Sequence, residues 1–141
     1  MSNITFTMIK PDAVEANNHG FILEKILASG FKITAMKMVL LSKYQAKKFY
    51  KIHDGKPFFK DLIDFITRGP VIVAVLNKNN AVEDFRSLIG ATDPNKAENG
   101  TIRKLFAKSV GENAIHGSDS NDNAKIESSF HFSTNEIFNE I

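Results

Sequence analysis

One histidine of the chain stands among residues that could support a nucleophilic ring. His116 lies in the segment from Asn113 to Ser120, among small and polar side chains, and Gly117 after it would permit a close approach or an unusual backbone angle. A nucleophilic histidine needs one ring nitrogen free and a partner that fixes the other nitrogen. Glu127, on a predicted helix after the loop, could fold back to orient the ring, with a serine hydroxyl holding its carboxylate. The alternative is an exposed loop histidine that takes no part in chemistry.

The other three histidines, His19, His53 and His131, lack such surroundings. We interpret them as ordinary residues that precede a helix, end a helix and lie between two phenylalanines. None pairs with another at the spacing of a helical metal site, and the chain has no cysteine, so we expect no zinc site. The lack of cysteine also excludes disulfides and suits a cytoplasmic protein.

Three cations could together bind a phosphate chain. Lys10 directly follows an apolar strand pattern, at a strand end of the kind where α/β sheets collect ligands. Arg86 and Arg103 each follow a predicted core position, so their side chains should point sideways from a helix. Two arginines and a lysine on one site would suit a triphosphate, because forked guanidinium groups match phosphate oxygens. A solvated surface cation is the alternative for each of the three.

One aromatic residue is a candidate platform for a nucleobase. Phe58 lies beside rather than on the apolar stripe of its predicted helix. An aromatic ring off the core face could stack on a base, and such stacking tolerates any base. Partial burial against a neighbouring helix or subunit is the alternative.

Size and charge limit the classes to which the chain can belong. Its 141 residues, 43% of them apolar, fit one compact domain with a sizeable core, so we expect residues 1–141 to form a single domain. No apolar run reaches the roughly 18 residues of a membrane helix, and no secretory signal is visible, which predicts a cytoplasmic protein without a membrane partner. The formal charge of +2 is small and mixed in sign, so nucleic acid is not expected as the main partner.

Apolar periodicity and capping residues predict the elements. Strands are expected over Ile4–Ile9, Phe31–Leu41 and Val71–Leu76, with a short fourth strand near Ala114–Ile115. Helices are expected over Gly20–Ser29, Ser42–Ile52, Pro57–Ile66, Asn80–Gly90, Thr101–Lys108, Asn121–Ser129 and Thr134–Glu140. Ser42, Asn80 and Ser133 each have Glu or Gln three residues later, which predicts a capping box at three of these helix starts.

The side-chain patterns predict how the strands are covered. Phe31, Ile33 and Ala35 alternate with polar or exposed types and should share one face of their strand. Val71–Leu76 is apolar at every position, as in a central strand covered on both faces. The order β-α-β-α-α-β-α with a late short strand predicts the α/β (α+β) class, with a four-stranded antiparallel sheet covered by helices in a ferredoxin-like split βαβ arrangement.

The segment Asn113-Ala114-Ile115-His116-Gly117-Ser118-Asp119-Ser120 resembles the active-site signature of the nucleoside diphosphate kinases, which is long and specific. The resemblance covers essentially the whole chain, with the family's motifs in order. It is carried further by Thr7–Val14, Lys56–Phe59, Arg68–Val71, Asn80–Val82, Arg86–Thr92 and Gly100–Arg103. The chain departs from the family pattern at Asp54-Gly55, Asn99 and Lys104-Leu105, and none of these departures replaces a residue with a chemical role.

The resemblance implies a ping-pong transfer. His116 would take the γ-phosphate of a nucleoside triphosphate, with ATP as the usual donor, and would pass it as phosphohistidine to a nucleoside diphosphate. Glu127 and Ser118 would position the His116 ring, and Tyr50 would stand beside the transferred phosphoryl group and Lys10.

The resemblance also implies how the nucleotide is held. Lys10, Arg86, Thr92 and Arg103 match phosphate-binding positions, and Lys10 and Asn113 match positions that hold the sugar hydroxyls. Phe58 with Val110 opposite would sandwich the base, helped by Leu62. A base that is only stacked would be poorly discriminated, which implies low base specificity.

The implied cofactor is Mg²⁺, held mainly by the nucleotide phosphates, with Asp119 as indirect support or as a contact through water. The implied assembly is a homo-oligomer built from dimers, as a tetramer or a hexamer. Two rival hypotheses are a catalytically idle nucleotide-binding paralogue and a nucleic-acid-binding protein. A paralogue of that kind usually loses the histidine or a phosphate cation, whereas every chemical position that can be matched is filled here.

Overall fold

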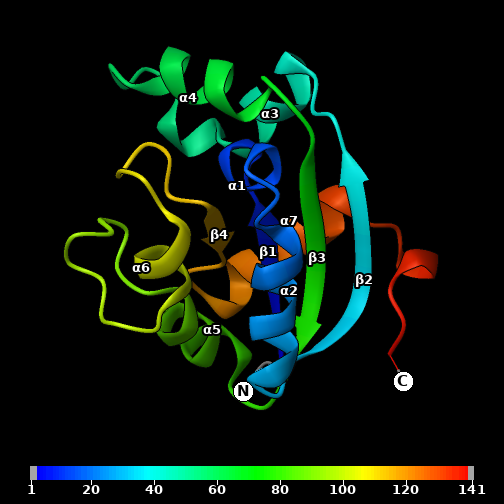
Figure 1. Ribbon diagram of the computed structural model, residues 1–141. Coiled ribbons are helices and arrows are strands. Elements are labelled where there is room, and N and C mark those ends of the chain that lie inside the picture. The colour runs from blue at the N-terminus through cyan, green and yellow to red at the C-terminus, as the bar shows by residue number, and fades with distance from the viewer. Residues whose placement is uncertain (1–2, 140–141) are drawn as a thin grey trace.

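Two central strands, β1 (Ile4–Ile9) and β3 (Val71–Asn77), form the middle of the sheet in the computed structural model, which describes residues 3–139 (Figure 1). The edge strand β2 (Lys32–Val39) pairs with β3, and the short β4 (Ile115–Gly117) pairs with β1. The order is β2-β3-β1-β4 and all pairings are antiparallel. This is the ferredoxin-like split βαβ arrangement, so the predicted fold class is confirmed.

Seven α-helices and two 3₁₀ turns are described around this sheet. The helices are α1 (Pro11–Glu15), α2 (His19–Ala28), α3 (Lys43–Phe49), α4 (Phe59–Ile66), α5 (Ala81–Ile89), α6 (Ile102–Phe106) and α7 (Asn121–His131). The turns are η1 (Lys51–His53) and η2 (Thr134–Glu136). No helix in the described range is long and apolar enough to cross a membrane.

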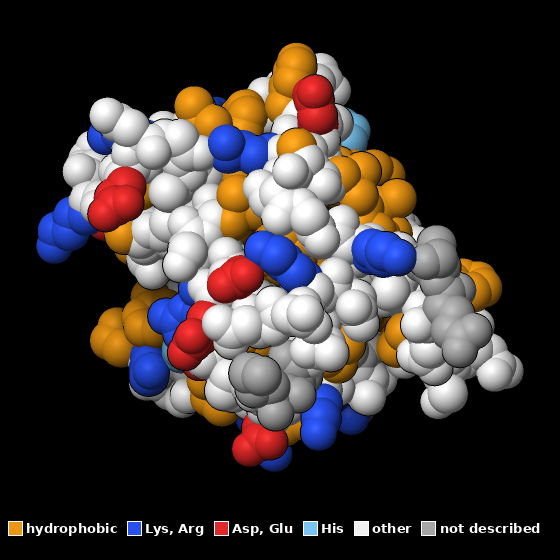
Figure 2. Space-filling view, turned by 90° about the horizontal axis from the view of Figure 1, so that it is seen from below, with side chains coloured by type: hydrophobic (Ala, Val, Ile, Leu, Met, Phe, Trp, Pro, Cys, Tyr) orange, Lys and Arg blue, Asp and Glu red, His pale blue; other side chains and the backbone are white. Residues whose placement is uncertain are grey.

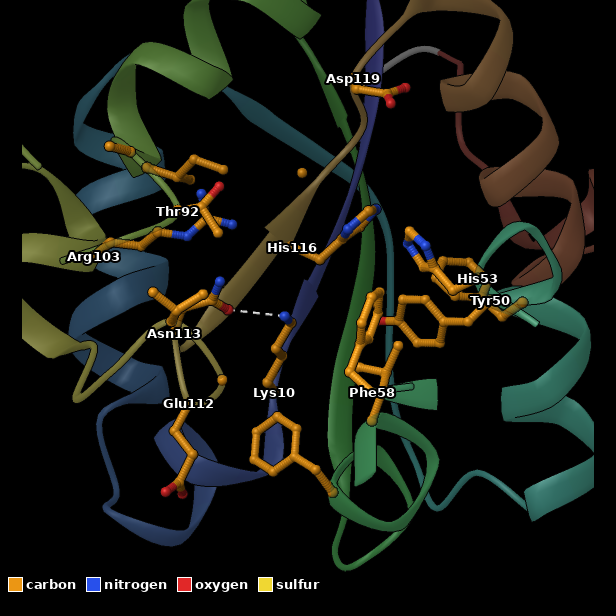
Figure 3. Close-up of a pocket in the computed structure, with 18 of the residues that line it drawn as sticks. Lys10, Tyr50, His53, Phe58, Thr92, Arg103, Glu112, Asn113, His116 and Asp119 are labelled. Atoms are coloured by element: carbon orange, nitrogen blue, oxygen red, sulfur yellow. Dashed lines mark hydrogen bonds between the residues drawn. The ribbon is translucent and has the colours of Figure 1, made fainter. Parts of the chain in front are cut away.

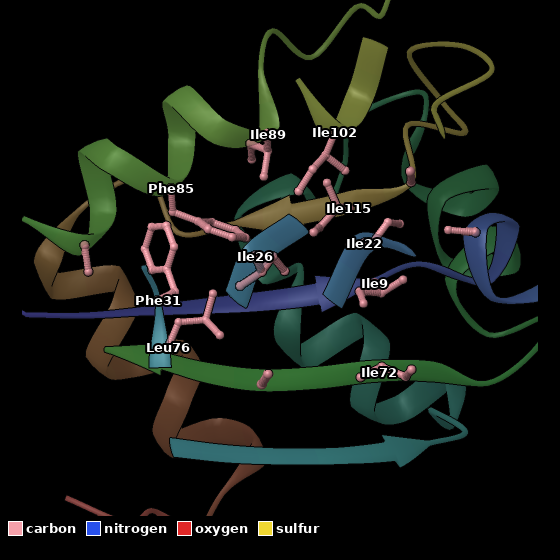
Figure 4. Packing of buried hydrophobic residues seen from close by; sticks show 14 residues of the cluster. Ile9, Ile22, Ile26, Phe31, Ile72, Leu76, Phe85, Ile89, Ile102 and Ile115 are labelled. Atoms are coloured by element: carbon pink, nitrogen blue, oxygen red, sulfur yellow. The ribbon is translucent and has the colours of Figure 1, made fainter. Parts of the chain in front are cut away.

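The central strands are buried on both faces, as the unbroken apolar run of β3 predicts. Alternate β3 residues belong to two separate cores, with Ile72 and Leu76 in one and Val73 and Val75 in the other. Figure 4 shows the first core, where side chains of α2, α5 and α6 meet the sheet. The second core receives Ala46 from α3, Ile63 and Ile66 from α4 and Phe132 from the end of α7. The two layers of helices therefore hold β1, and the β4 strand beside it, in a fixed place.

The edge strand β2 departs from the predicted alternation. Its register with β3 shifts between Ile33 and Ala35, where Thr34 is the extra residue of a bulge. Ile33 packs against the first core and Ala35 belongs to the second, so the prediction that they share a face is wrong. A one-residue bulge reverses which side each later residue faces, and simple alternation cannot show it.

The helix starts agree with the sequence in part. Ser42 and Gln45 form the predicted capping box of α3. Ser133 and Glu136 also form a capping box, but it starts only the 3₁₀ turn η2, so the predicted helix over Thr134–Glu140 is wrong as far as the described residues reach, and Glu140 lies outside them. Asn80 precedes α5 in a left-handed conformation with φ +55°, and its side chain makes no cap to the backbone.

Candidate active site

The His116 ring is held from behind by a carboxylate. β4 pairs with β1 so that His116 lies opposite Met8, and α7 brings Glu127 over the same edge of the sheet. Nε2 of His116 lies 3.0 Å from Oε1 of Glu127. The fully buried Ser118 hydroxyl donates to the same oxygen at 2.7 Å and accepts a hydrogen bond from the Phe6 amide. The position of the Glu127 carboxylate is thus fixed by Ser118 as well as by its contact with the ring.

This contact decides which ring nitrogen is free. A carboxylate that accepts from Nε2–H fixes the imidazole in the tautomer whose Nδ1 carries a lone pair. The His116 side chain is 23% exposed and lines a cavity, into which Figure 3 shows it pointing. Phe6 and Phe49 pack against the ring, with centroids 6.1 Å and 5.8 Å away, and restrict its rotation.

The backbone just before His116 is strained. Ala114 has φ +71°, and the Ile115 amide donates to the Asn113 carbonyl at 2.8 Å, which closes a tight γ-turn around Ala114. The start of the chain clamps this turn: Asp12 Oδ2 accepts from the Ala114 amide at 3.0 Å, and the Lys10 amide donates to the Ala114 carbonyl at 2.8 Å. A conformation of this kind costs of order 1–3 kcal/mol and persists only where its surroundings enforce it.

Gly117 allows side chains of the core to pack closely against β4, the strand that carries His116. A Cβ atom there would lie 2.9 Å from Cδ2 of Phe85 and 3.1 Å from Cδ1 of Ile89. Of the two possibilities raised by the sequence, close approach is therefore the one that applies.

Two of the predicted cations are nearly buried and face the same space. The Nζ atom of Lys10 donates to Oδ1 of Asn113 at 2.8 Å (Figure 3). Burial, aided by the nearby Arg103, lowers the pKa of Lys10 from 10.5 to about 8. Arg103 donates to the carbonyls of Gly90 and Ile115 at 3.0 and 2.8 Å, and burial, with a smaller effect from Arg86, lowers its pKa to about 10. Gathering like charges in a buried place is unfavourable unless an anion joins them.

Arg86, the third predicted cation, and the Thr92 hydroxyl lie on the same side of the cavity as Lys10 and Arg103. Arg86 is exposed at the surface of α5 and donates to the Asp119 carbonyl at 3.3 Å. Thr92 is exposed in the segment after Gly90 and lines the same cavity. The Asp119 carboxylate also lines it and accepts from Asn123 Nδ2 at 2.6 Å.

Tyr50 closes the opposite wall. Its side chain is buried, and its hydroxyl finds no hydrogen-bond partner among the described residues. Burial and then the charge of Glu127 raise the pKa of Tyr50, so the hydroxyl stays protonated and can donate to an incoming group. An orphaned donor beside a cavity suits a polar ligand that supplies the acceptor.

One cavity of about 1100 Å³ collects almost all of the residues selected from the sequence. It is lined by Lys10, Tyr50, Phe58, Leu62, Arg86, Thr92, Arg103, Val110, Asn113, His116, Asp119 and Glu127. Ser118 is the exception, because it lies buried behind Glu127. Phe58 and Val110 are about half exposed, at 48% and 55%, which leaves their surfaces available to a planar ligand.

Several residues of this site were not predicted from the sequence, and His53 and Asp12 are two of them. His53 is not the ordinary helix-terminal residue that the sequence predicts, because it lines the cavity with its ring centroid 5.4 Å from that of Phe58. Its position between Tyr50 and Phe58 in the chain was the available signal. Asp12 is buried and holds the Ala114 amide, and burial raises the pKa of its carboxyl group. Its place two residues after Lys10 was the corresponding signal.

Comparisons with known proteins identify the family. Residues 3–137 match the sequence model of the family described as nucleoside diphosphate kinase. The nucleoside diphosphate kinase of Flavobacterium psychrophilum is 54% identical over 137 residues, which cover 97% of this chain and 99% of that protein. That of Chloroherpeton thalassium is 53% identical over 94% of each chain.

Solved structures give the same result. The Aquifex aeolicus nucleoside diphosphate kinase matches with a TM-score of 0.93 and 40% identity, covering 96% of this chain and 98% of that one. A halophilic nucleoside diphosphate kinase from Halobacterium salinarum, solved in complex with CDP, matches with a TM-score of 0.95 and 35% identity, covering 100% of this chain and 94% of that one. The chain belongs to the nucleoside diphosphate kinase family, whose members transfer a phosphoryl group between nucleotides through a phosphohistidine.

Proposed function

We propose that the phosphoryl group is carried on Nδ1 of His116. The observation that supports this most strongly is the 3.0 Å contact between Nε2 and Glu127, because it leaves Nδ1 with a free lone pair on a ring that lines the cavity. Nδ1 attacks the γ-phosphorus of a nucleoside triphosphate, the N–P bond forms, and the bond to the β-phosphate oxygen breaks as the diphosphate leaves. An acceptor diphosphate then attacks the phosphohistidine in the reverse sense. The Glu127 carboxylate stabilises the positive charge that the ring acquires.

The cations supply the remaining stabilisation. Phosphoryl transfer depends mainly on positioning and on balancing the charge of the phosphate oxygens. Lys10, Arg86, Thr92 and Arg103 bind the phosphates in this proposal. Tyr50 donates its unpartnered hydroxyl to the transferred group, beside Lys10.

The base and sugar occupy the outer half of the cavity. Phe58 and Val110 enclose the base with help from Leu62, and Asn113 and Lys10 hold the sugar hydroxyls. A stacked base is bound without being read, which favours low base specificity. The CDP complex of the Halobacterium salinarum relative supports a nucleoside diphosphate as a ligand of this site.

Mg²⁺ is the proposed cofactor and arrives with the nucleotide. The described residues 3–139 hold no group of three acidic or histidine side chains that could bind a metal by themselves. Among the carboxylates that line the cavity, that of Asp119 fits a contact to the ion through water, and the phosphates provide most of the ligands. When bound, the ion would offset charge on the phosphate oxygens.

We further propose that each chain forms a single domain and that the protein is cytoplasmic. We also propose that the chains form dimers, which assemble into a tetramer or a hexamer. Exposed apolar side chains support an assembly: Met36 and Met38 on β2, and Leu40 just after it, alternate along the chain and are 50%, 55% and 65% exposed. Nucleic acid is not proposed as the main partner. On the face shown in Figure 2, Lys and Arg side chains are interspersed with Asp and Glu rather than gathered into one basic surface.

Transfer of labelled phosphate tests the proposed function. Incubation with γ-labelled ATP and Mg²⁺ should give labelled protein whose label is lost in acid and kept in alkali. An added nucleoside diphosphate should then remove the label and become a labelled triphosphate. Nucleotide binding without any protein labelling would instead indicate an idle binder.

A further inference from the structure

An ion-pair network at the outer wall of the cavity involves residues to which no role has been given above. Arg68, in the turn between α4 and β3, donates from Nε and Nη2 to the two carboxylate oxygens of Glu15 at 2.8 and 3.0 Å. The same Nη2 donates to Oε1 of Glu112 at 2.8 Å. Glu15 ends α1, and Glu112 belongs to the loop between α6 and β4. One guanidinium group thus joins three separate segments.

The loop that Arg68 holds carries a wall of the base site. Residues 108–112 contain Val110 and have no helix or strand. The loop folds back on itself at Glu112, whose carbonyl accepts from the Lys108 and Ser109 amides at 2.9 and 3.3 Å. Within the described part of the chain, Glu112 is the residue through which this loop makes a hydrogen bond or ion pair with another segment.

The other end of the network is anchored to the opposite wall. The Arg68 guanidinium lies over the ring of Phe65, 4.9 Å from its centroid, and Phe65 belongs to α4 with Leu62. Arg68, Phe65 and Glu112 all line the cavity, and Figure 3 shows Glu112 at its margin. The Arg68–Glu112 contact therefore links the loop that carries Val110 to the wall formed by α4.

Ordinary surface ion pairs contribute little, so the geometry matters here. The three side chains are 37–47% exposed, and isolated pairs at such exposure are worth about 0–1 kcal/mol. This network differs in having a bidentate arginine, two carboxylates and an aromatic ring under the guanidinium. Planar arginine in such a setting loses little freedom when it binds, and lysine could not replace it.

We infer that the ion pair between Arg68 and Glu112, here called the clasp, sets the distance between the Val110 loop and α4, the two walls of the base site. Arg68 is then a positioning residue for the base. This inference rests on the proposed function of the cavity. The phosphate half is held independently, because Asn113 is bonded to Lys10, and Arg103 is bonded to the carbonyls of Gly90 and Ile115. Loss of the clasp should therefore weaken the hold on the base and spare the hold on phosphates.

Binding measurements with two probes test the clasp. Calorimetric titration with ADP reports the base and phosphate halves together, and titration with inorganic tripolyphosphate reports the phosphate half alone. Arg68→Gln and Glu112→Gln should each weaken ADP binding roughly five- to tenfold. This corresponds to about 1–1.4 kcal/mol, which is more than an isolated exposed ion pair contributes and less than a buried hydrogen bond to a charged group. The double variant should be no worse than either single variant, because both remove the same contact. Tripolyphosphate should bind all of them as it binds the unchanged protein.

Asp64→Asn is the matched control. Asp64 lies on α4, outside the cavity lining, and forms ion pairs with Lys43 and Lys60 that are at least as exposed. Its loss should leave ADP binding unchanged. The clasp is contradicted if ADP affinity is unchanged in the Arg68 and Glu112 variants, if their losses multiply in the double variant, or if tripolyphosphate affinity falls equally. Failure of the unchanged protein to bind ADP would contradict the proposed function itself.

Discussion

Oε1 of Glu127 lies 3.0 Å from Nε2 of His116, and this contact spans two elements, α7 and β4. This contact makes the two ring nitrogens different, since Nε2 is bound to the carboxylate and Nδ1 keeps its lone pair. The Ser118 hydroxyl holds the carboxylate from behind, so the orientation does not depend on the nucleotide being present.

Replacing Glu127 with alanine should lower turnover while sparing nucleotide affinity. The ring would lose its partner for Nε2, and a hydrogen bond to a charged group is worth about 1.5–3 kcal/mol. We expect kcat to fall roughly 10- to 100-fold, with KM for the diphosphate within about twofold, as measured by steady-state kinetics. Glu136→Ala, which removes an exposed carboxylate paired with Lys37, should leave both unchanged. A large loss of affinity with turnover intact would contradict the orienting role.

The activity should fall as pH rises through the pKa of Lys10. This pKa is lowered by burial to about 8, so the side chain is cationic below that pH and neutral above it. A neutral amine attracts phosphate less, so kcat/KM, which reports the free enzyme, should decline above about pH 8. Lys10→Arg should remove this decline, since a guanidinium stays charged there, even if it lowers the activity overall. A pH profile with the same decline in both proteins would assign it to another group.

Gly117→Ala should cost both stability and activity. The added methyl group would lie 2.9 Å from the Phe85 ring, and Phe85 is fully buried, so either the ring or β4 must move. Overpacking of this kind costs about 1–3 kcal/mol, measurable by urea denaturation, and displacement of β4 would move His116 as well. Gly20→Ala adds the same methyl group where nothing lies within 4 Å, on α2, and should leave the free energy of unfolding equal or higher. Equal stability of the two variants would show that the close approach is not needed.

Much of the fold follows from patterns that are local in the sequence. The apolar run of β3 and the stripes of α4 and α5 identify a sheet covered on both faces. The bulge at Thr34 was not predicted because it depends on how β2 pairs with β3. The left-handed conformation of Asn80 was not predicted either, although asparagine adopts it more readily than most residues. Apolar periodicity depends only on the types of residues in the sequence, and these are the same with or without a bulge or a left-handed residue.

The residues of the site could be predicted where they belong to motifs that resemble the family, above all the segment Asn113–Ser120. The convergence of Lys10, Arg86 and Arg103 on one cavity could not be inferred from spacing, because they come from three separate segments. The turn at Ala114 was not predicted either, since alanine is not a residue that favours a positive φ. The place of His53 in the cavity wall could not be predicted, because it depends on how the fold arranges the Tyr50 and Phe58 rings around it.

The most direct test is to locate the phosphoryl group after reaction with ATP alone. Peptide mapping of the labelled protein should find the group on His116, and ³¹P NMR should identify the Nδ1 rather than the Nε2 isomer. His116→Ala should take up no label, whereas His131→Ala, at a partly buried ring that stacks on Phe6, should still be labelled at His116. Undiminished labelling of His116→Ala, or a phosphoryl group on Nε2, would contradict the account.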